Sequence, residues 1–224
     1  MLLGLVGMLL VILAACNTAS ASAGNPALSS ISLSPTGTPG MGTPMPCPTG
    51  MGPCPPGMMA PAQLVQNGHY SDERFIDMMV PHHLMAIQMA QVAQKQGEHA
   101  EIKQLAANII TAQGQEIKEL KALKQRLYGT AETPTMMNPV QMDNTGMLMP
   151  DQLARQHPFD QAFIDSMIAH HASAIAMASV ALQRSSNPDI RRIARNIVNA
   201  QSAEIGQMIQ WRQHWYPASS ALMR

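Results

Sequence analysis

Residues 69 to 216 contain one sequence pattern twice, at an offset of 88 residues and without gaps. The clearest matches are Phe-Ile-Asp at 75–77 and 163–165, His-His at 82–83 and 170–171, and Ala-Gln at 112–113 and 200–201. A register held over this length indicates duplication of one structural unit. The two halves are therefore expected to fold in the same way and to carry equivalent chemical groups.

Each unit contains two helical segments. The first helix of the first unit is expected from Asp72 to about Gln96, with Asp72 as a capping residue and Gly97 as a helix stop. A second helix follows in each unit, and its start is clearest in the second, where Asn187 caps and Pro188 takes the first helical position. Each unit is therefore a helical hairpin.

The two hairpin repeats are predicted to cover residues 69–128 and 157–216, with a linker at 129–156 and a tail at 217–224. The linker contains proline and methionine and lacks a helical period. Fully extended, at roughly 3.3 Å per residue, it could run the length of a helix, so it leaves the relative direction of the hairpins open. Because one hairpin leaves its apolar stripe exposed, we expect an all-α protein in which two tandem hairpins close into a four-helix bundle.

Polar residues fall on the faces that should form the core. In the first helix, His82 and His83 share the core-facing arc with Met79, and Met89 lies on one flank. The predicted buried stripe of the second helix consists of Leu105, Ile109, Ala112, Glu116, Leu120 and Leu123, with Gln113 at its margin. The bundle core should therefore contain four histidines, two glutamates and several methionines.

Burying so many polar groups costs stability unless each is paired or bound to metal. Because the same groups occur in both repeats, a metal site is favoured over a buried polar network. Neutral imidazole suits copper, and methionine thioether favours Cu(I) over zinc or iron. The predicted copper residues are Met79, His82, His83, Met89 and Glu116, and their equivalents Met167, His170, His171, Met177 and Glu204, the glutamates acting as ligands or as hydrogen-bond acceptors behind the ligands.

The N-terminal part of the chain has a different composition. Residues 1–15 form an apolar run of the length of a signal-peptide core, and the small residues before Cys16 resemble the lipobox of bacterial lipoproteins, in which the cysteine is lipidated. The alternative is an ordinary secretory signal cut near Ala21 or Ala23. Both alternatives place the protein outside the cytoplasm, as a membrane-anchored lipoprotein or a periplasmic protein.

Residues 16–68 are predicted to form a disordered tether rich in methionine, proline and glycine, with no charged residue from 17 to 67. Cys47 and Cys54 lie within it among several methionines. In an oxidising compartment they could form a local disulfide, and with the methionine sulfurs they could instead collect a soft metal ion. The sequence leaves both alternatives open.

The charge balance limits the partners. Lysine plus arginine (14) equals aspartate plus glutamate (14), so no net charge draws the chain to nucleic acid or to an acidic membrane. A lipid anchor is the only membrane attachment predicted. Homo-oligomerisation and a copper-handling partner protein are both left open.

Three segments of the first repeat resemble a known bacterial family, called domain of unknown function 305. They are residues 75–83 (FIDMMVPHH), residues 86–90 (AIQMA) and residues 113–116 (QGQE), and both repeats match. The resemblance implies a ferritin-like four-helix bundle, export from the cytoplasm and, as in some members, copper binding. The second unit departs from the pattern with Ser166 for Met78 and Ala169 for Pro81.

The sequence therefore predicts an exported, lipid-anchored protein that sequesters or delivers copper. An enzyme is not expected: a ferritin-like di-iron oxidase uses Glu-x-x-His motifs, and the sequence has none. The other alternative is a structural or interaction bundle whose core histidines are simply hydrogen-bonded. The sequence does not say whether copper would be stored, delivered or sensed.

Overall fold

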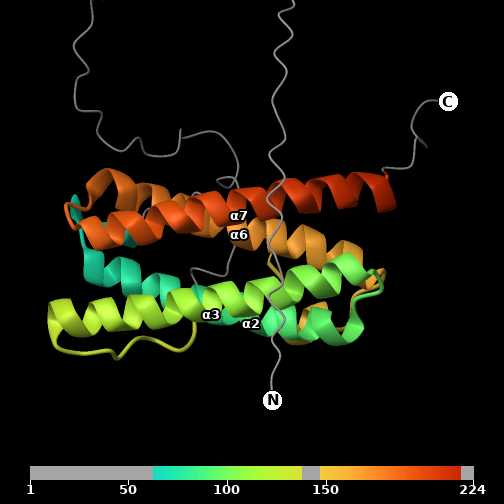
Figure 1. The fold of residues 1–224 in the computed structure, drawn as a ribbon, viewed down its shortest axis with the longest axis horizontal. Coiled ribbons are helices and arrows are strands. Elements are labelled where there is room, and N and C mark those ends of the chain that lie inside the picture. The colour runs from blue at the N-terminus through green and yellow to red at the C-terminus, as the bar shows by residue number, and fades with distance from the viewer. Residues whose placement is uncertain (1–62, 138–146, 218–224) are drawn as a thin grey trace, which may run out of the picture. The chain divides into compact units, whose positions relative to one another are not determined.

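The structure is a computed structural model, and it describes residues 63–137 and 147–217. The predicted signal segment, Cys16, Cys47, Cys54 and most of the predicted tether lie outside the described residues. Four long helices lie side by side (Figure 1). They are α2 (Asp72–Gln96), α3 (Ala100–Tyr128), α6 (Phe159–Arg184) and α7 (Pro188–Trp215). The predicted all-α four-helix bundle is thus confirmed.

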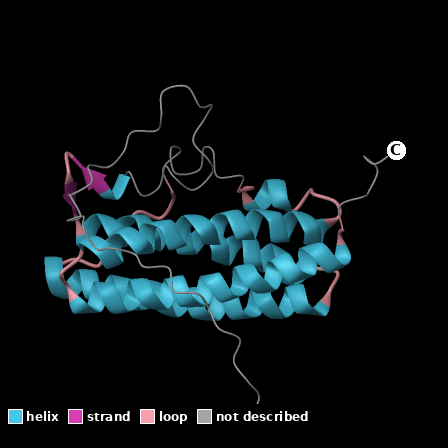
Figure 2. Ribbon diagram, turned by 90° about the horizontal axis from the view of Figure 1, so that it is seen from above, coloured by secondary structure: helices cyan, strands magenta, loops and turns pink. Residues whose placement is uncertain are grey.

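Three short elements accompany the bundle. The strands β1 (Val65–Gln66) and β2 (His69–Tyr70) pair in an antiparallel hairpin at one end of the bundle (Figure 2). Asn67 and Gly68 both have positive φ, as a tight two-residue hairpin turn requires. The one-turn helix α5 (Pro150–Leu153) lies in the connection between the hairpins. None of these elements was predicted from the sequence.

The helix ends follow the capping signals closely. The Asn187 side chain accepts hydrogen bonds from the backbone N–H groups of Asp189 and Ile190, so α7 starts at Pro188 as predicted. At the start of α2 the capping side chain is Ser71 rather than Asp72, because the Ser71 hydroxyl accepts from a backbone N–H in the first turn. Helix α2 continues through Pro81 without a break.

Contacts between helix ends define the direction of the two hairpins. Asp160, buried at the start of α6, accepts hydrogen bonds from the backbone N–H groups of Glu98 and His99, in the turn between α2 and α3, at 2.9 and 2.8 Å. Arg126 near the end of α3 pairs with Asp189 at the start of α7 at 2.7 Å. Helices α2 and α6 are therefore antiparallel, and so are α3 and α7. The connection from α3 to α6 starts at one end of the bundle and finishes at the other, as in bundles with one long crossover.

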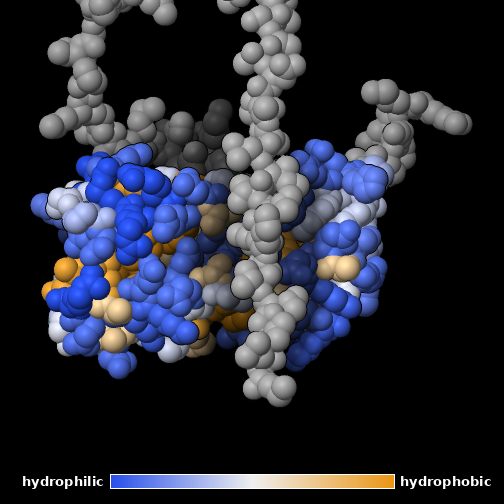
Figure 3. Space-filling model, viewed as in Figure 1, coloured by the Kyte–Doolittle hydropathy of each residue, from blue (hydrophilic) through white to orange (hydrophobic). Residues whose placement is uncertain are grey.

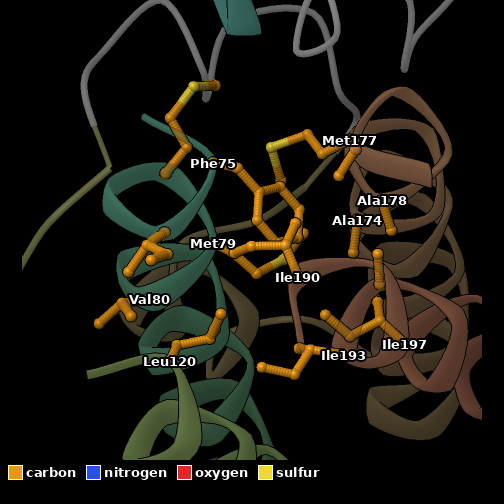
Figure 4. Packing of buried hydrophobic residues seen from close by; sticks show 14 of the residues in the cluster. Phe75, Met79, Val80, Leu120, Ala174, Met177, Ala178, Ile190, Ile193 and Ile197 are labelled. Atoms are coloured by element: carbon orange, nitrogen blue, oxygen red, sulfur yellow. The ribbon is translucent and has the colours of Figure 1, made fainter. Parts of the chain in front are cut away.

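The core consists of two groups of buried side chains. The first core cluster includes Phe75, Met79, Leu120, Met177 and Ile193, and Figure 4 shows part of it. The second core cluster includes Met89, Ile102, Ile109, Phe163 and Met167. In sequence, the paired histidines of α2 and α6 lie between the members of these two clusters. The polar residues therefore occupy the middle of the bundle, with apolar packing on both sides.

The outer surface is mostly hydrophilic in the view of Figure 3, with smaller hydrophobic areas between the polar ones. No helix within the described ranges is long and apolar enough to cross a membrane.

Two predictions about the core were wrong. Ala112 is exposed and Gln113 is buried, so the stripe of the second helix is rotated towards the glutamine. The tether was expected to extend to residue 68, but Leu64 is fully buried in the first core cluster, and its carbonyl accepts a hydrogen bond from Arg74. The short hairpin holds Leu64 against the helices, and an isolated leucine carries no periodic signal that could have revealed it.

Leu64→Ala tests whether this residue is part of the folded domain. Removing a fully buried leucine side chain is expected to lower the free energy of unfolding by about 2–4 kcal/mol. Val65→Ala, at a half-buried position, is the matched control and should cost clearly less. Urea denaturation followed by circular dichroism measures both. Equal, small effects would place Leu64 outside the core.

Candidate metal centre

Four histidines lie at the centre of the bundle and all are fully buried. His82 and His83 come from α2, and His170 and His171 come from α6. The rings of His82 and His170 are in direct contact, with centroids 3.7 Å apart. The structure therefore brings the two predicted histidine pairs together, because α2 and α6 cross the core antiparallel with these residues at the same level.

The inner histidines are held by hydrogen bonds that join α2 to α6. The hydroxyl of Ser173 donates to the carbonyl of His170 at 2.9 Å, so its oxygen accepts from Nε2 of His82 at 2.5 Å. Nε2 of His170 lies 3.0 Å from the carbonyl oxygen of His82, which can only accept. Both imidazoles therefore carry their hydrogen on Nε2. In the neutral form of each ring, Nδ1 then holds a lone pair.

The outer histidines each contact a carboxylate of the neighbouring helix. His83 Nε2 donates to Glu116 of α3 at 2.8 Å, and His171 Nε2 donates to Glu204 of α7 at 2.6 Å. The two pairs are equivalent under the 88-residue repeat. Both carboxylates are partly exposed, at 19% and 21%. In the structure the predicted glutamates thus accept hydrogen bonds from Nε2 of the outer imidazoles, on the side of each ring away from Nδ1.

All four imidazoles have a second nitrogen with no partner. The Nδ1 atoms of His82, His83, His170 and His171 are buried and lack a hydrogen-bond partner. An unpartnered polar atom in a core is costly, and such atoms are rare. Histidines that bind metals typically donate their other ring N–H to a carboxylate, a carbonyl or another acceptor. All four Nε2 atoms do this here, so the free Nδ1 atoms have the chemistry of metal ligands.

Burial also controls the protonation of the inner pair. Loss of solvation, and secondarily the nearby imidazole of His170, hold the pKa of His82 well below its usual value. The pKa of His170 is lowered in the same way by burial and then by His171 and His83. Both rings are therefore neutral at physiological pH, which is the form that coordinates a metal ion.

The predicted methionines are all buried but fall into two groups. Met79 and Met177 belong to the first core cluster, whereas Met89 and Met167 belong to the second. Met79 and Met89 are ten residues apart on one helix, which corresponds to roughly 15 Å. They cannot both contact the same ion. Each cluster instead combines one of these four methionines from each repeat, a pairing that the sequence repeat alone did not indicate.

Nitrogen and oxygen ligands alone do not form a metal site in the described part of the chain. There, no three His, Cys, Asp or Glu side chains gather into a set that could hold a metal ion. The described residues thus contain no carboxylate-rich cluster of this kind.

Sequence reasoning missed three polar residues of the centre. Ser173 was not identified, because a lone serine on an apolar helix face is common. Gln113 and Gln201 are buried, and neither the amide oxygen nor the amide nitrogen of either side chain has a hydrogen-bond partner. The repeated Ala-Gln pair could have indicated both glutamines, because it places an amide one turn before Glu116 and before Glu204.

Comparisons with known proteins agree with this architecture. The family described as "Domain of unknown function (DUF305)" matches the chain over residues 19–124 and 72–212. The chain belongs to this family. No curated protein matches it in sequence.

Several solved structures are similar to the chain. CopM in the Cu(II)-bound form is 42% identical, with a TM-score of 0.61, and the match covers 66% of this chain and 99% of CopM. CopM in the Cu(I)-bound form is 39% identical, with a TM-score of 0.58 and the same coverage. A DUF305 fragment from Deinococcus radiodurans is 25% identical, with a TM-score of 0.56, over 62% of this chain and 93% of the fragment.

The buried imidazoles predict how the stability of the metal-free protein depends on pH. In the unfolded chain, His82 and His170 take up protons near pH 6.5, whereas burial keeps them neutral well below that value in the folded protein. The unfolded state then binds more protons, so the free energy of unfolding should fall as pH decreases below about 6.5. For two groups the slope reaches about 2.7 kcal/mol per pH unit. Urea denaturation between about pH 7 and pH 5 measures it.

The matched control for this pH dependence is the double variant His82→Leu and His170→Leu. It lacks both buried imidazoles, so its unfolding should depend less steeply on pH. If the native protein and the double variant showed the same slope, the pH dependence would have to be assigned to other groups.

Proposed function

We propose that the protein binds copper as cargo in the centre of its helical bundle. The observation that carries this proposal is the set of four buried Nδ1 atoms without partners, each on an imidazole whose Nε2 already has an acceptor. A merely structural histidine cluster would be expected to satisfy both ring nitrogens. A metal ion is a partner that can use the lone pair of an Nδ1 whose ring already donates its Nε2 hydrogen to an acceptor.

The choice of metal follows from the other ligands available. The core supplies methionine sulfur from Met79 and Met177 in one cluster and from Met89 and Met167 in the other. Neutral imidazole and thioether are ligands that copper accepts, and thioether favours Cu(I). Each set of methionines comes from both repeats, so we propose sites that combine the two halves of the bundle.

The similarity to CopM supports the same metal. Solved forms of CopM carry Cu(I), Cu(II) or silver, and the match covers 99% of the Cu(I), Cu(II) and co-crystallised silver forms. Silver(I) has the charge and the ligand preference of Cu(I). Identity near 40% over the whole of CopM makes a shared metal chemistry the simplest proposal for this chain.

The proposal includes the location and the role. The apolar segment before Cys16 supports export and lipid anchoring, so the bundle would act outside the cytoplasm. We propose a binding protein that sequesters or delivers copper rather than an enzyme. In this role the glutamates act through the imidazoles: they accept the Nε2 hydrogen and orient Nδ1 towards the ion.

The double variant His82→Leu and His170→Leu tests the core site directly. Leucine removes the nitrogen ligands and approximately keeps the buried volume, and the hydroxyl of Ser173 keeps its bond to the carbonyl of residue 170. The metal-free variant should therefore remain folded, because polar groups have been replaced by apolar ones. The variant should bind fewer Cu(I) ions per chain, or its Cu(I) affinity should fall by more than ~10–100-fold, the loss typical when a residue that hydrogen-bonds to a metal ligand is changed. Competition with a Cu(I) chelator measures both quantities.

The control is His69→Ala with His157→Ala, an exposed pair related by the same repeat. It should leave Cu(I) binding unchanged. Unchanged binding in the His82 and His170 double variant would move copper away from the core and reduce its histidines to a structural role.

The glutamates offer a second, more graded test. In Glu116→Gln with Glu204→Gln, the amide oxygens can still accept from Nε2 but the negative charges are lost. Cu(I) affinity should fall by about 10–100-fold, while stoichiometry is kept. Glu119→Gln is the matched control, because Glu119 is partly exposed and pairs only with Arg192 on the surface. Equal affinities in the two variants would show that the carboxylates do not tune the site.

A further inference from the structure

A second sulfur-rich region lies at the edge of the bundle core, where the connection between the hairpins packs against α2. It is a pocket of about 280 Å³ lined by Pro81, Met85 and Gln88 of α2 and by Thr135, Met136, Met137 and Met149 of the connection. Four of these seven residues are methionines. We refer to it as the methionine pocket.

The methionine pocket is open on one side and closed on the other. Met85 and Met137 are 6% and 7% exposed and belong to the same core cluster, against which Met149 also packs. Met136 is 80% exposed, more than any other large apolar residue of the described chain. Methionine commonly fills irregular gaps in a core, but a side chain this exposed fills none. The Met136 thioether is therefore accessible from solvent.

The backbone around the pocket is anchored on both sides. The N–H of Leu148 donates to Ser166 of α6 at 2.8 Å, and the N–H of Met149 donates to the side chain of Gln152 at 3.0 Å. On the other side, Lys124 of α3 donates to the carbonyl of Glu132 at 2.8 Å. Hydrogen bonds thus fix the backbone on both sides of the pocket, while rotation about the methionine side-chain bonds lets the sulfur atoms change position.

The methionine pocket has no counterpart in the second repeat. The residues equivalent to Pro81, Met85 and Gln88 at the 88-residue offset are Ala169, Ser173 and Ala176. Met85 therefore breaks the internal symmetry. Its equivalent in the second repeat, Ser173, accepts the hydrogen bond from Nε2 of His82. The pocket is not a copy of the histidine centre, and it forms only where the connection covers α2.

The lining groups define the ligand. No charged side chain lines the pocket, so nothing there would compensate a divalent cation. Thioether sulfur is a neutral, soft ligand that selects Cu(I) over hard cations and over zinc. We propose that the methionine pocket is a separate binding site for a soft monovalent cation, Cu(I) or its analogue Ag(I), with Met85, Met136, Met137 and Met149 as the ligands.

This inference deepens the proposed function, because it assigns the same cargo to a second site. The methionine pocket lies on the same turns of α2 as the histidines: Pro81 directly precedes His82, and Met85 follows His83 by two residues. An ion bound there would sit at the solvent side of the helix that carries the core ligands. Met136, the exposed ligand, would make the first contact with the incoming ion.

The test uses the full chain, methionine methyl groups labelled with carbon-13, and Ag(I) as the probe. The triple variant Met136→Leu, Met137→Leu and Met149→Leu keeps side chains of similar size and should stay folded. It is expected to bind one Ag(I) fewer per chain than the native protein in equilibrium dialysis. In NMR spectra the methyl signal of Met85 should shift with Ag(I) in the native protein and not in the triple variant. Equal stoichiometry, or a Met85 signal that never moves, would overturn the site.

Two controls keep the result unambiguous. Met208→Leu changes a buried methionine of the same core cluster that does not line the pocket, and it should bind as the native protein does. Met136→Leu alone changes an exposed side chain that cannot disturb the fold, and it should weaken the Met85 response even if the triple variant folds poorly. An unweakened response in Met136→Leu would remove Met136 from the ligands.

The two sites can fail separately. Loss of one ion in the triple variant, with no effect of the His82 and His170 double variant, would support the methionine pocket and overturn the core site. The reverse result would overturn the methionine pocket alone. A native protein that bound no Ag(I) and no Cu(I) would overturn both proposals.

Discussion

The centre of the bundle depends on the hydrogen bonds that join α2 to α6 through His82, Ser173 and His170. The register of α2 against α6 is also held at the helix ends by Asp160, which accepts from the backbone N–H groups of Glu98 and His99. The bonds from His82 to Ser173 and from His170 to the carbonyl of His82 are satisfied in one register only. That register places the four imidazoles at one level and directs Nε2 of His82 and His170 towards acceptors, whereas Nε2 of His83 and of His171 donates to a glutamate of its own hairpin. The contact between the inner rings, and the burial that keeps those rings neutral, follow from it.

A core with unpartnered polar atoms lowers the free energy of unfolding of the ligand-free protein. Four imidazole nitrogens and two glutamine amides are buried without partners, and each such group costs free energy that apolar replacements would not. Local violations of the packing rules are typical of functional sites, where the rest of the fold supplies the compensating stability. Here the compensation comes from apolar clusters on both sides and from ion pairs and caps at the helix ends, such as Asp160 with His99 at 2.7 Å. A bound soft metal would use the nitrogen lone pairs that the protein leaves free.

Duplication explains the symmetry of the molecule, and two departures from it explain the asymmetry. The pairs His83 with Glu116 and His171 with Glu204 are equivalent and have nearly the same geometry. Position 85 and its equivalent 173 differ, with methionine in one repeat and serine in the other. Serine at 173 provides the acceptor for His82, whereas His170 has no such hydroxyl opposite it and uses a backbone carbonyl instead. Methionine at 85 faces the connection between the hairpins, which itself is present only once. The difference at positions 85 and 173, together with the single connection, gives the two halves different surroundings.

The sequence by itself determined the helices, their paired arrangement and the burial of the two histidine pairs. The cap at Asn187 and the position of His82 and His83 on the apolar arc could be predicted because capping and helical periodicity act within a few residues. The 88-residue repeat could be recognised by comparing the chain with itself. The direction of the second hairpin was decided only by tertiary contacts, since a connection of this length can reach either end of a helix. The same holds for the burial of Gln113 and Leu64, for the role of Ser173 and for the grouping of Met79 with Met177. Each of these depends on which side chain of another helix stands opposite, and that is a property of the packed bundle, absent from any single segment of the chain.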